Sequence, residues 1–233
     1  MRIVCAVAVL VAANLLNNWL ARGPYAYVPI CVTATAVLLL IARRDGLTPA
    51  DLGLDAAGVR RGLRWAPLLA GAVLVVLLLL LSVPAGREAF RDARAVDLSA
   101  AELWERVLVR VPFGTVLLEE TAFRGVLWAM IRRRRGTAWA TTVSSLLFGL
   151  WHLLPSRGLG RSNAALATVF GSGSADVAPI VLVAVAAMTA AGVVLCELRR
   201  RSGSLLAPAA LHWAVNSFGY ALAWATSRWW PSA

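Results

Sequence analysis

Two adjacent carboxylates and an arginine lie inside an apolar stretch at residues 116–130. Glu119, Glu120 and Arg124 are surrounded there by leucine, phenylalanine, valine and tryptophan, so water is not an obvious partner. On a helix, Glu120 and Arg124 share one face and can pair, whereas Glu119 points about 100° away. An ionisable residue at mid-bilayer costs about 3 kcal/mol on insertion scales, so such residues usually mark functional sites. The spacing predicts an ion pair that could simply fix helix packing, and a second carboxylate that is left free for chemistry.

The two histidines of the chain lie in two other apolar segments. Phe148 and His152 are four residues apart in one segment, and His212 and Asn216 are four residues apart in the other. Each pair therefore shares a helical face. A lone histidine on an apolar face is often a satisfied packing residue. Here both histidines occupy apolar segments, and a third segment carries an unpaired carboxylate, which predicts that the three segments converge on one site.

These residue types suit hydrolysis. A carboxylate and an imidazole in a low-dielectric cavity can hold a water molecule and abstract its proton. A second imidazole and an amide can donate hydrogen bonds to the oxyanion that forms on a scissile carbonyl. One glutamate and two histidines would equally suit a catalytic zinc ion with an open coordination position, although the chain has no H-E-x-x-H motif. The residues alone leave both routes open.

The elements that must position these residues are apolar runs of roughly 17–25 residues, long enough to span the hydrocarbon core of a bilayer. The 233 residues are 60% apolar and only 15% charged. The pattern predicts an all-α, polytopic transmembrane helix bundle of about seven spans, within a range of six to eight, around an intramembrane polar site. The spans are expected at residues 3–20, 25–42, 65–83, 107–131, 138–154, 177–198 and 204–224, with a polar connector at 45–64 and a surface loop at 85–106.

All 23 basic residues are arginines, and the formal net charge is +11. They cluster at the ends of apolar runs, notably at 132–135 and 199–201, which fits lipid headgroups and topogenic signals and argues against a nucleic-acid partner. Because more of them lie on the side of the N-terminus, the positive-inside rule predicts a cytoplasmic-type membrane with the N-terminus inside. Three widely spaced cysteines, Cys5, Cys31 and Cys196, indicate no disulfide framework.

Three short motifs together resemble the CPBP intramembrane proteases, a family that includes CAAX prenyl endopeptidases and bacteriocin-processing and immunity proteins. The motifs are E-E-x-x-x-R at Glu119, Glu120 and Arg124, F-x-x-x-H at Phe148 and His152, and H-x-x-x-N at His212 and Asn216. Each motif is weak alone, but three in order on successive apolar segments are specific. The resemblance implies a catalytic core of four spans at 107–233, after an N-terminal transmembrane region of three spans at 1–106.

The resemblance also implies roles for these residues. Glu119 would activate water with help from His152, His212 and Asn216 would stabilise the oxyanion, and Glu120 with Arg124 would orient the site. The family is called metalloprotease, so a divalent metal, zinc if any, is one expected cofactor, and a metal-free glutamate mechanism is the other. The expected substrate is a membrane-associated peptide or protein, including lipid-modified ones, that reaches the site from the arginine-rich side.

Two other functions compete with proteolysis. A non-catalytic interaction protein of the same family, for instance one that confers bacteriocin immunity, is the alternative, but the complete set of Glu119, His152, His212 and Asn216 favours catalysis. A proton-coupled transporter would predict two related halves, and the sequence shows no internal repeat.

Overall fold

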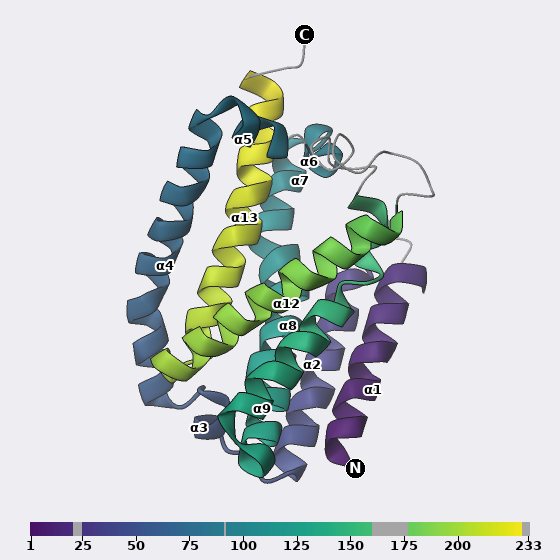
Figure 1. Cartoon of the computed structure of the whole chain (residues 1–233), viewed down its shortest axis with the longest axis vertical. Helices are drawn as coiled ribbons and strands as arrows, with labels where there is room; N and C mark the ends of the chain where they lie inside the picture. Colours follow the sequence, from purple (N-terminus) through teal and green to yellow (C-terminus); the bar gives the residue numbers. More distant parts are fainter. Residues whose placement is uncertain (21–24, 91, 160–176, 230–233) are drawn as a thin grey trace.

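A computed structural model gives the fold, and it describes residues 1–20, 25–90, 92–159 and 177–229. Within these ranges all regular structure is helical. The long helices run side by side, with the N-terminus at one end of the bundle and the C-terminus at the other (Figure 1). In chain order the helices are α1 (Arg2–Leu15) with η1 (Leu16–Leu20), α2 (Tyr27–Arg44), α3 (Pro49–Leu52), α4 (Ala56–Ser82), α5 (Pro84–Ala89), α6 (Ala93–Val96), α7 (Ala100–Glu105), η2 (Arg106–Val116), α8 (Leu117–Glu119), η3 (Glu120–Leu127), α9 (Trp128–Trp151), η4 (Pro155–Gly158), α12 (Val177–Ser202) and α13 (Leu206–Trp229).

The expected all-helical transmembrane bundle is confirmed at the level of fold class. By length and apolar composition, four helices of the described chain can cross a membrane, namely Arg2–Trp19, Tyr27–Arg44, Pro49–Ser82 and Val177–Ser202. Large apolar side chains such as Leu68, Leu79 and Leu182 are exposed on their outer faces, as lipid contact requires. The segments expected as the other three spans are helical too, but their polar content is higher. The count of seven therefore stays a prediction.

The expected polar connector at 45–64 is wrong in its second half, because α4 begins at Ala56. Asp55 caps this helix by accepting a hydrogen bond from the Gly58 amide at 3.1 Å. Just before it, the Thr48 hydroxyl accepts from the Asp51 amide while the Asp51 carboxylate accepts from the Thr48 amide, so both free amides at the start of α3 are satisfied. The connector is thus a pair of capped helix starts.

The chain reverses direction at Gly136, inside the run labelled α9. This residue has φ 83° and ψ 175°, a backbone conformation that is essentially limited to glycine. It separates the helix that ends at Arg135 from the helix that carries Phe148 and Trp151. Two of the three motif-bearing segments therefore form an antiparallel pair, as the expected spans at 107–131 and 138–154 require.

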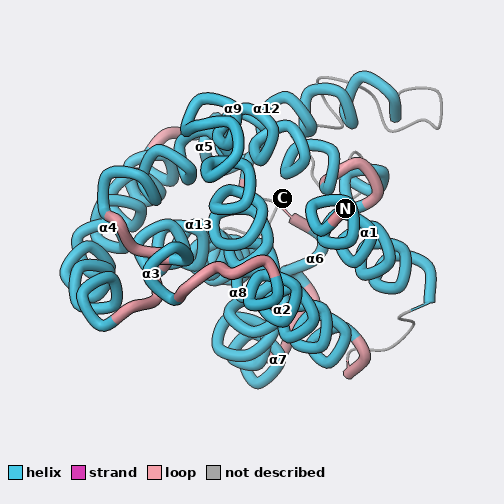
Figure 2. Tube along the Cα trace, turned by 90° about the horizontal axis from the view of Figure 1, so that it is seen from below, coloured by secondary structure: helices cyan, strands magenta, loops and turns pink. Residues whose placement is uncertain are grey.

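The centre of the bundle is the helix that carries the carboxylate motif. Every residue from Leu118 to Ile131 is buried. Helices α2, α9, α12 and α13 all contact this stretch, and Figure 2, which looks along the bundle, shows how they surround it. The motif is therefore enclosed within the bundle by the elements next to it.

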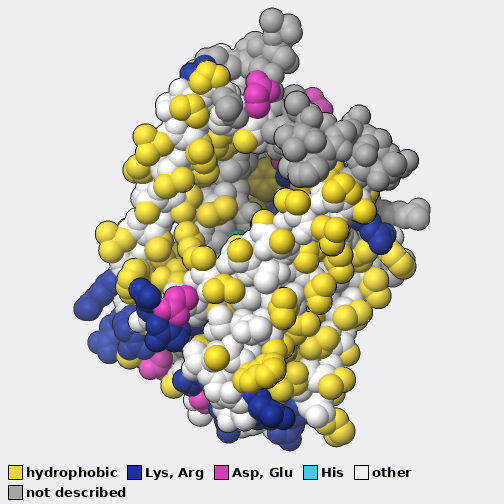
Figure 3. Space-filling model, viewed as in Figure 1, with side chains coloured by type: hydrophobic (Ala, Val, Ile, Leu, Met, Phe, Trp, Pro, Cys, Tyr) yellow, Lys and Arg dark blue, Asp and Glu magenta, His cyan; other side chains and the backbone are white. Residues whose placement is uncertain are grey.

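Arginine side chains gather at the end of the bundle that holds the N-terminus (Figure 3). There Arg134 donates to both carboxylate oxygens of Asp45 at 2.7 and 2.9 Å, and Arg199 donates to the Asp51 carbonyl at 2.9 Å. The Arg61 guanidinium donates to the Ser202 carbonyl at 2.9 Å. These contacts join the first turns of α9 to the end of α2, and the end of α12 to α3 and α4, so the basic clusters at 132–135 and 199–201 share one end of the molecule.

Candidate active site

The helix that carries the first motif is wound more widely than an α-helix over η2 and η3. Pro112 lies inside η2 and lacks an amide donor, and its own carbonyl accepts from the Leu117 amide five residues on. Two residues later, Gly114 lets α2 approach closely, because a Cβ there would lie 2.5 Å from the Tyr27 ring. Local widening of an α-helix is often found at functional sites. Here it sets the direction in which Glu119 and Glu120 point.

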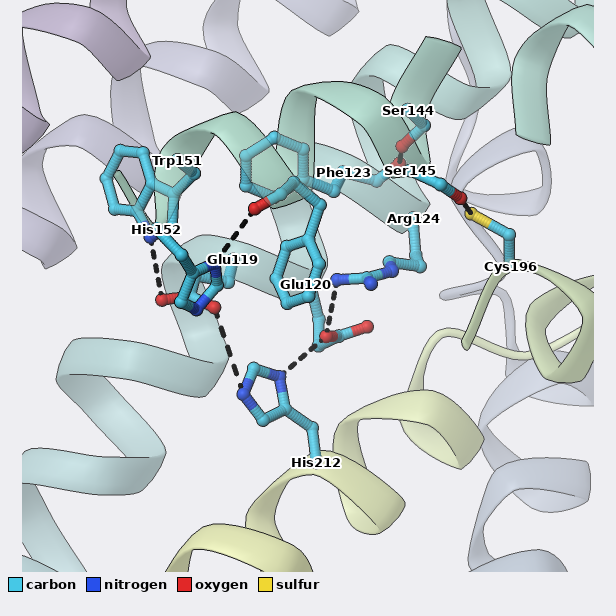
Figure 4. A network of polar contacts seen from close by, with 11 residues as sticks. Glu119, Glu120, Phe123, Arg124, Ser144, Ser145, Trp151, His152, Cys196 and His212 are labelled. Atoms are coloured by element: carbon cyan, nitrogen blue, oxygen red, sulfur yellow. Dashed lines mark hydrogen bonds and ion pairs between the residues drawn. The ribbon is translucent and has the colours of Figure 1, made fainter. Parts of the chain in front are cut away.

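Glu120 is held by two partners at the centre of the bundle. Arg124 donates to Glu120 Oε1 at 2.9 Å, and His212 Nδ1 lies 2.7 Å from the same oxygen (Figure 4). The Arg124 side chain is fully buried, and its guanidinium lies over the Phe148 ring at 3.9 Å from the centroid. The predicted pairing of Glu120 with Arg124 is confirmed, and a histidine from a distant helix joins it.

Glu119 has different partners, and one of its oxygens is free. The Trp151 indole N–H donates to Glu119 Oε1 at 2.9 Å. No described side chain or backbone group makes a hydrogen bond to Glu119 Oε2, although this atom is buried. His212 Nε2 lies 3.8 Å from it, so the two ring nitrogens of His212 face the two adjacent carboxylates (Figure 4). Glu119 Oε2 is therefore a buried acceptor without a hydrogen-bond partner among the described groups.

His152 ends the helix that carries Phe148. Its Nδ1 lies 2.8 Å from the Phe148 carbonyl oxygen. Since a carbonyl only accepts, Nδ1 must carry the proton, and Nε2 of the neutral ring is then an acceptor. The ring also packs edge-on against Phe148 at 4.8 Å between centroids. The fixed tautomer makes Nε2 the nitrogen that is available to take a proton from water.

A cavity of about 420 Å³ joins these groups. Glu119, His152 and Asn216 line it together with Trp151, from three different helices. The described lining also contains Arg94, Arg106 and Arg110. The remaining described lining residues are Asn17, Asn18, Tyr27, Val111, Thr115, Pro155, Ser156, Leu159, Ala184, Met188 and Tyr220.

The cavity lies towards the end of the bundle opposite the arginine clusters. Its wall includes Asn17 and Asn18 at the end of the first span, Arg94 of α6 and Pro155 beyond α9. Asn17, Asn18 and Pro155 follow the ends of α1 and α9 that are remote from the arginine clusters. Figure 1 places α6 and α7 at the end where the C-terminus emerges. This arrangement disagrees with the expectation that substrate reaches the site from the arginine-rich side.

The expected divalent metal finds no ready set of ligands. Among the residues that the structure describes, no three His, Cys, Asp or Glu side chains are grouped so that they could hold a metal ion. His212 Nδ1 is already engaged with Glu120, and His152 Nδ1 with a carbonyl. The arrangement of these described side chains therefore does not fit a three-ligand zinc site.

All six predicted site residues lie in one region of the bundle. Glu119, His152 and Asn216 line the cavity, His212 contacts both glutamates, and Glu120 with Arg124 lies behind His212. Trp151 was not among the predicted site residues, yet it donates a hydrogen bond to Glu119. A signal was available, because a buried indole N–H usually needs an acceptor and Trp151 directly precedes His152. Asn14 supports it by donating to the Trp151 carbonyl at 2.7 Å.

Comparison with known proteins agrees with this site. Residues 102–218, half of the chain, match the family described as type II CAAX prenyl endopeptidase Rce1-like. No curated protein and no solved structure gives a match. The matched region contains all three motifs, whereas the expected division of the chain at residue 106 stays a prediction. With its complete motif set gathered in one place, the chain belongs to the type II CAAX prenyl endopeptidase Rce1-like family.

Proposed function

We propose that this protein is an intramembrane endopeptidase in which Glu119 activates the attacking water. The observation that carries the proposal is that Glu119, unlike Glu120, lines a cavity shared with His152 and Asn216, and that its Oε2 has no partner among the described groups. Trp151 binds the other oxygen and so fixes the direction of the carboxylate. A base held in this way needs little reorganisation when it takes a proton.

In the first step, a water molecule bound at Glu119 Oε2 gives its proton to that oxygen, and the remaining hydroxide attacks the scissile carbonyl carbon. His152 Nε2 is an acceptor on the same cavity wall and assists in orienting the water. The carbonyl π bond becomes a C–O⁻ bond, which gives a tetrahedral intermediate. Positioned base catalysis of this type contributes about 10²–10⁴-fold to the rate.

In the second step, the oxyanion is stabilised and the C–N bond breaks. We assign the oxyanion donors to Asn216 and His212, four residues apart on α13. Because the Nδ1–H of His212 faces Glu120, His212 donates to the oxyanion from Nε2 as the imidazolium. Glu120 Oε1 holds His212 Nδ1 at 2.7 Å, and the Arg124 guanidinium holds Glu120, so these two residues position His212. The proton on Glu119 passes to the leaving nitrogen, which departs as an amine. Preorganised donors at such an oxyanion are worth about 3–4 kcal/mol each.

The substrate that we propose is the lipid-modified C-terminus of a protein. The family description names prenyl CAAX substrates, in which a lipid is attached to a cysteine followed by three residues. An apolar pocket of about 360 Å³ lies between α1 and α9, and Trp151 lines both this pocket and the polar cavity. Val7, Leu10, Leu147 and Leu150 form part of the pocket wall. A lipid chain could occupy it while the peptide reaches Glu119.

Cleavage in heavy-oxygen water tests this proposal. The purified chain in vesicles is given a synthetic peptide that ends in a farnesylated cysteine and three further residues, and the products are weighed by mass spectrometry. Water activation predicts that the three terminal residues leave with a free amine and that the farnesylated cysteine gains one ¹⁸O in its new carboxylate during a single turnover. Intact peptide after prolonged incubation would contradict the activity. A first turnover that transfers ¹⁶O would contradict the role of Glu119 as a base. A parallel reaction with a chelator, with zinc added back, shows whether a metal takes part.

A further inference from the structure

The cavity contains more positive charge than the proposed reaction uses. Its described lining has three arginines, Arg94, Arg106 and Arg110, against a single carboxylate, Glu119. Arg94 is neutralised locally, because it makes a bidentate pair with Asp92. Arg106 and Arg110 are thus the two arginines of the cavity wall that need an explanation.

Neither of these two arginines has a carboxylate partner in the described parts of the chain. Arg110 lies over the Tyr27 ring at 4.8 Å, and Arg106 over the Tyr220 ring at 5.2 Å. Arg106 also donates from one terminal nitrogen to the Arg94 carbonyl, but its buried Nε has no hydrogen-bond partner there. Aromatic contacts fix both guanidinium groups in place and leave donors unused. A partly buried charge without a partner is costly, so the arrangement suits an incoming anion.

We infer that Arg106 and Arg110 form a subsite for the terminal carboxylate of the peptide substrate. The inference rests on the proposed function and deepens it. Arg110 and Glu119 are nine residues apart in one continuous helix, which places their backbones about 13 Å apart at ~1.5 Å per residue. Three extended residues span about 10 Å, and the arginine side chain covers the remainder. A terminus three residues beyond the scissile bond would therefore reach Arg110, and Arg106 lies about one turn further along the same helix.

The position of the two arginines favours a peptide carboxylate over a lipid headgroup. Both are on the wall of the cavity that holds Glu119, and both are half-buried against rings from other helices. A guanidinium can bind both oxygens of a carboxylate at once, and lysine cannot reproduce that geometry. The subsite would fix the register of the peptide, and so determine which bond lies at Glu119.

Paired peptides test this inference. Two farnesylated peptides of one sequence, one with a free C-terminal acid and one with a C-terminal amide, are cleaved by the full chain in phosphatidylcholine vesicles. We expect the acid to have the lower KM, by about 10–100-fold, as loss of a charged hydrogen bond predicts. Arg110→Gln and Arg106→Gln should abolish this preference, because KM for the acid should rise towards KM for the amide. Arg110→Lys should retain part of it. Arg60→Gln, an exposed arginine of α4 outside the cavity, is the matched control and should behave as wild type.

The outcomes that overturn the inference are distinct from failure of the proposed function. Retention of the wild-type acid preference in both glutamine variants would overturn it. Equal KM values of the wild type for the acid and the amide would overturn it as well. If, in addition, the variants changed only the dependence of cleavage on anionic lipid in the vesicles, the arginines would be assigned to lipid headgroups. Binding of the two peptides to Glu119→Gln, followed by fluorescence anisotropy, needs no cleavage. A preference for the acid that disappears with Arg110→Gln in this background supports the subsite even if no product ever forms.

Discussion

Two adjacent glutamates each leave one buried oxygen without a partner among the described groups, but of the two only Glu119 lines the cavity. Glu120 shares one oxygen between Arg124 and His212 and faces the packed centre of the bundle. Glu119 has one oxygen held by Trp151 and one without a partner among the described groups, on the wall of a cavity. The first is suited to holding a neighbour in position, and the second to proton transfer.

Removal of either member of the buried pair should affect folding as well as activity. Glu120→Ala or Arg124→Ala strands one buried charge, at an expected cost of about 3–5 kcal/mol in stability. Unfolding in detergent, followed by intrinsic fluorescence, measures the loss. The double variant Glu120→Leu with Arg124→Met removes both charges and should be more stable than either single variant, yet inactive. Single variants as stable as wild type would show that the Glu120–Arg124 pair does not contribute to stability.

Trp151→Phe tests the hydrogen bond that orients Glu119. The ring remains and the indole N–H is lost, so the fold should be retained while kcat falls about 10–100-fold, the value of a hydrogen bond to a charged group. Trp139→Phe is the matched control, because Trp139 lies on the same run but is exposed. Equal kcat for Trp151→Phe and wild type would mean that Glu119 is oriented by something else.

At the residue scale, the sequence predicted pairs within a helix better than pairs between helices. Glu120 and Arg124 were predicted to pair because they are four residues apart. The contacts of His212 with Glu120 and of Trp151 with Glu119 join residues 92 and 32 positions apart, and no local rule specifies them. The placement of both histidines and a free carboxylate in apolar segments predicted that the motifs converge, whereas the geometry required the structure.

The turn at Gly136 is the element on which the pairing of the first two motifs depends. Its positive φ of 83° with an extended ψ cannot be adopted by an L side chain without strain. Gly136→Ala should cost about 1–3 kcal/mol in stability although a Cβ there has open space around it. Gly71→Ala, in the interior of α4 and equally open, is the control and should be neutral or slightly stabilising. The measurement is the midpoint of thermal unfolding. The same midpoint for Gly136→Ala and wild type would show that the turn can rearrange.

Helix ends were harder to predict than helix centres. Hydropathy placed the apolar centres correctly, but three arginines between residues 60 and 64 made the start of α4 look like a loop. The Asp55 cap, which begins the helix, is a local signal that outweighs hydropathy there. The wide winding of η2 and η3 could not be predicted, because it depends on how Pro112, Gly114 and α2 pack together.

At the scale of the whole molecule, ion pairs join the helices at the arginine-rich end. Hydrogen bonds from Arg134 hold the pKa of Asp45 below its usual range against the opposing effect of burial. The contribution of this pair to stability is therefore present above the unfolded value of about 3.9 and is lost as the pH falls through the lowered pKa. Asp45→Asn should lower Tm at pH 7, and the gap to wild type should close below about pH 4.

The control for this pH dependence is Asp97→Asn, an exposed aspartate at the opposite end of the bundle. It should leave Tm unchanged across the same range. A gap for Asp45→Asn that is constant from pH 7 to pH 3 would assign the effect to packing and not to the ionised carboxylate.

The rate of peptide cleavage by Glu119→Gln tests the central claim most directly. Glutamine keeps the size of the side chain and can still accept from Trp151, but it cannot take a proton from water. Glu105→Gln, an exposed glutamate at the end of α7 on the same continuous helix, is the matched control. With both variants folded as judged by Tm, kcat should fall by about 10²–10⁴-fold for Glu119→Gln and remain at the wild-type value for Glu105→Gln. A folded Glu119→Gln that cleaves the farnesylated peptide at the wild-type rate would contradict the account.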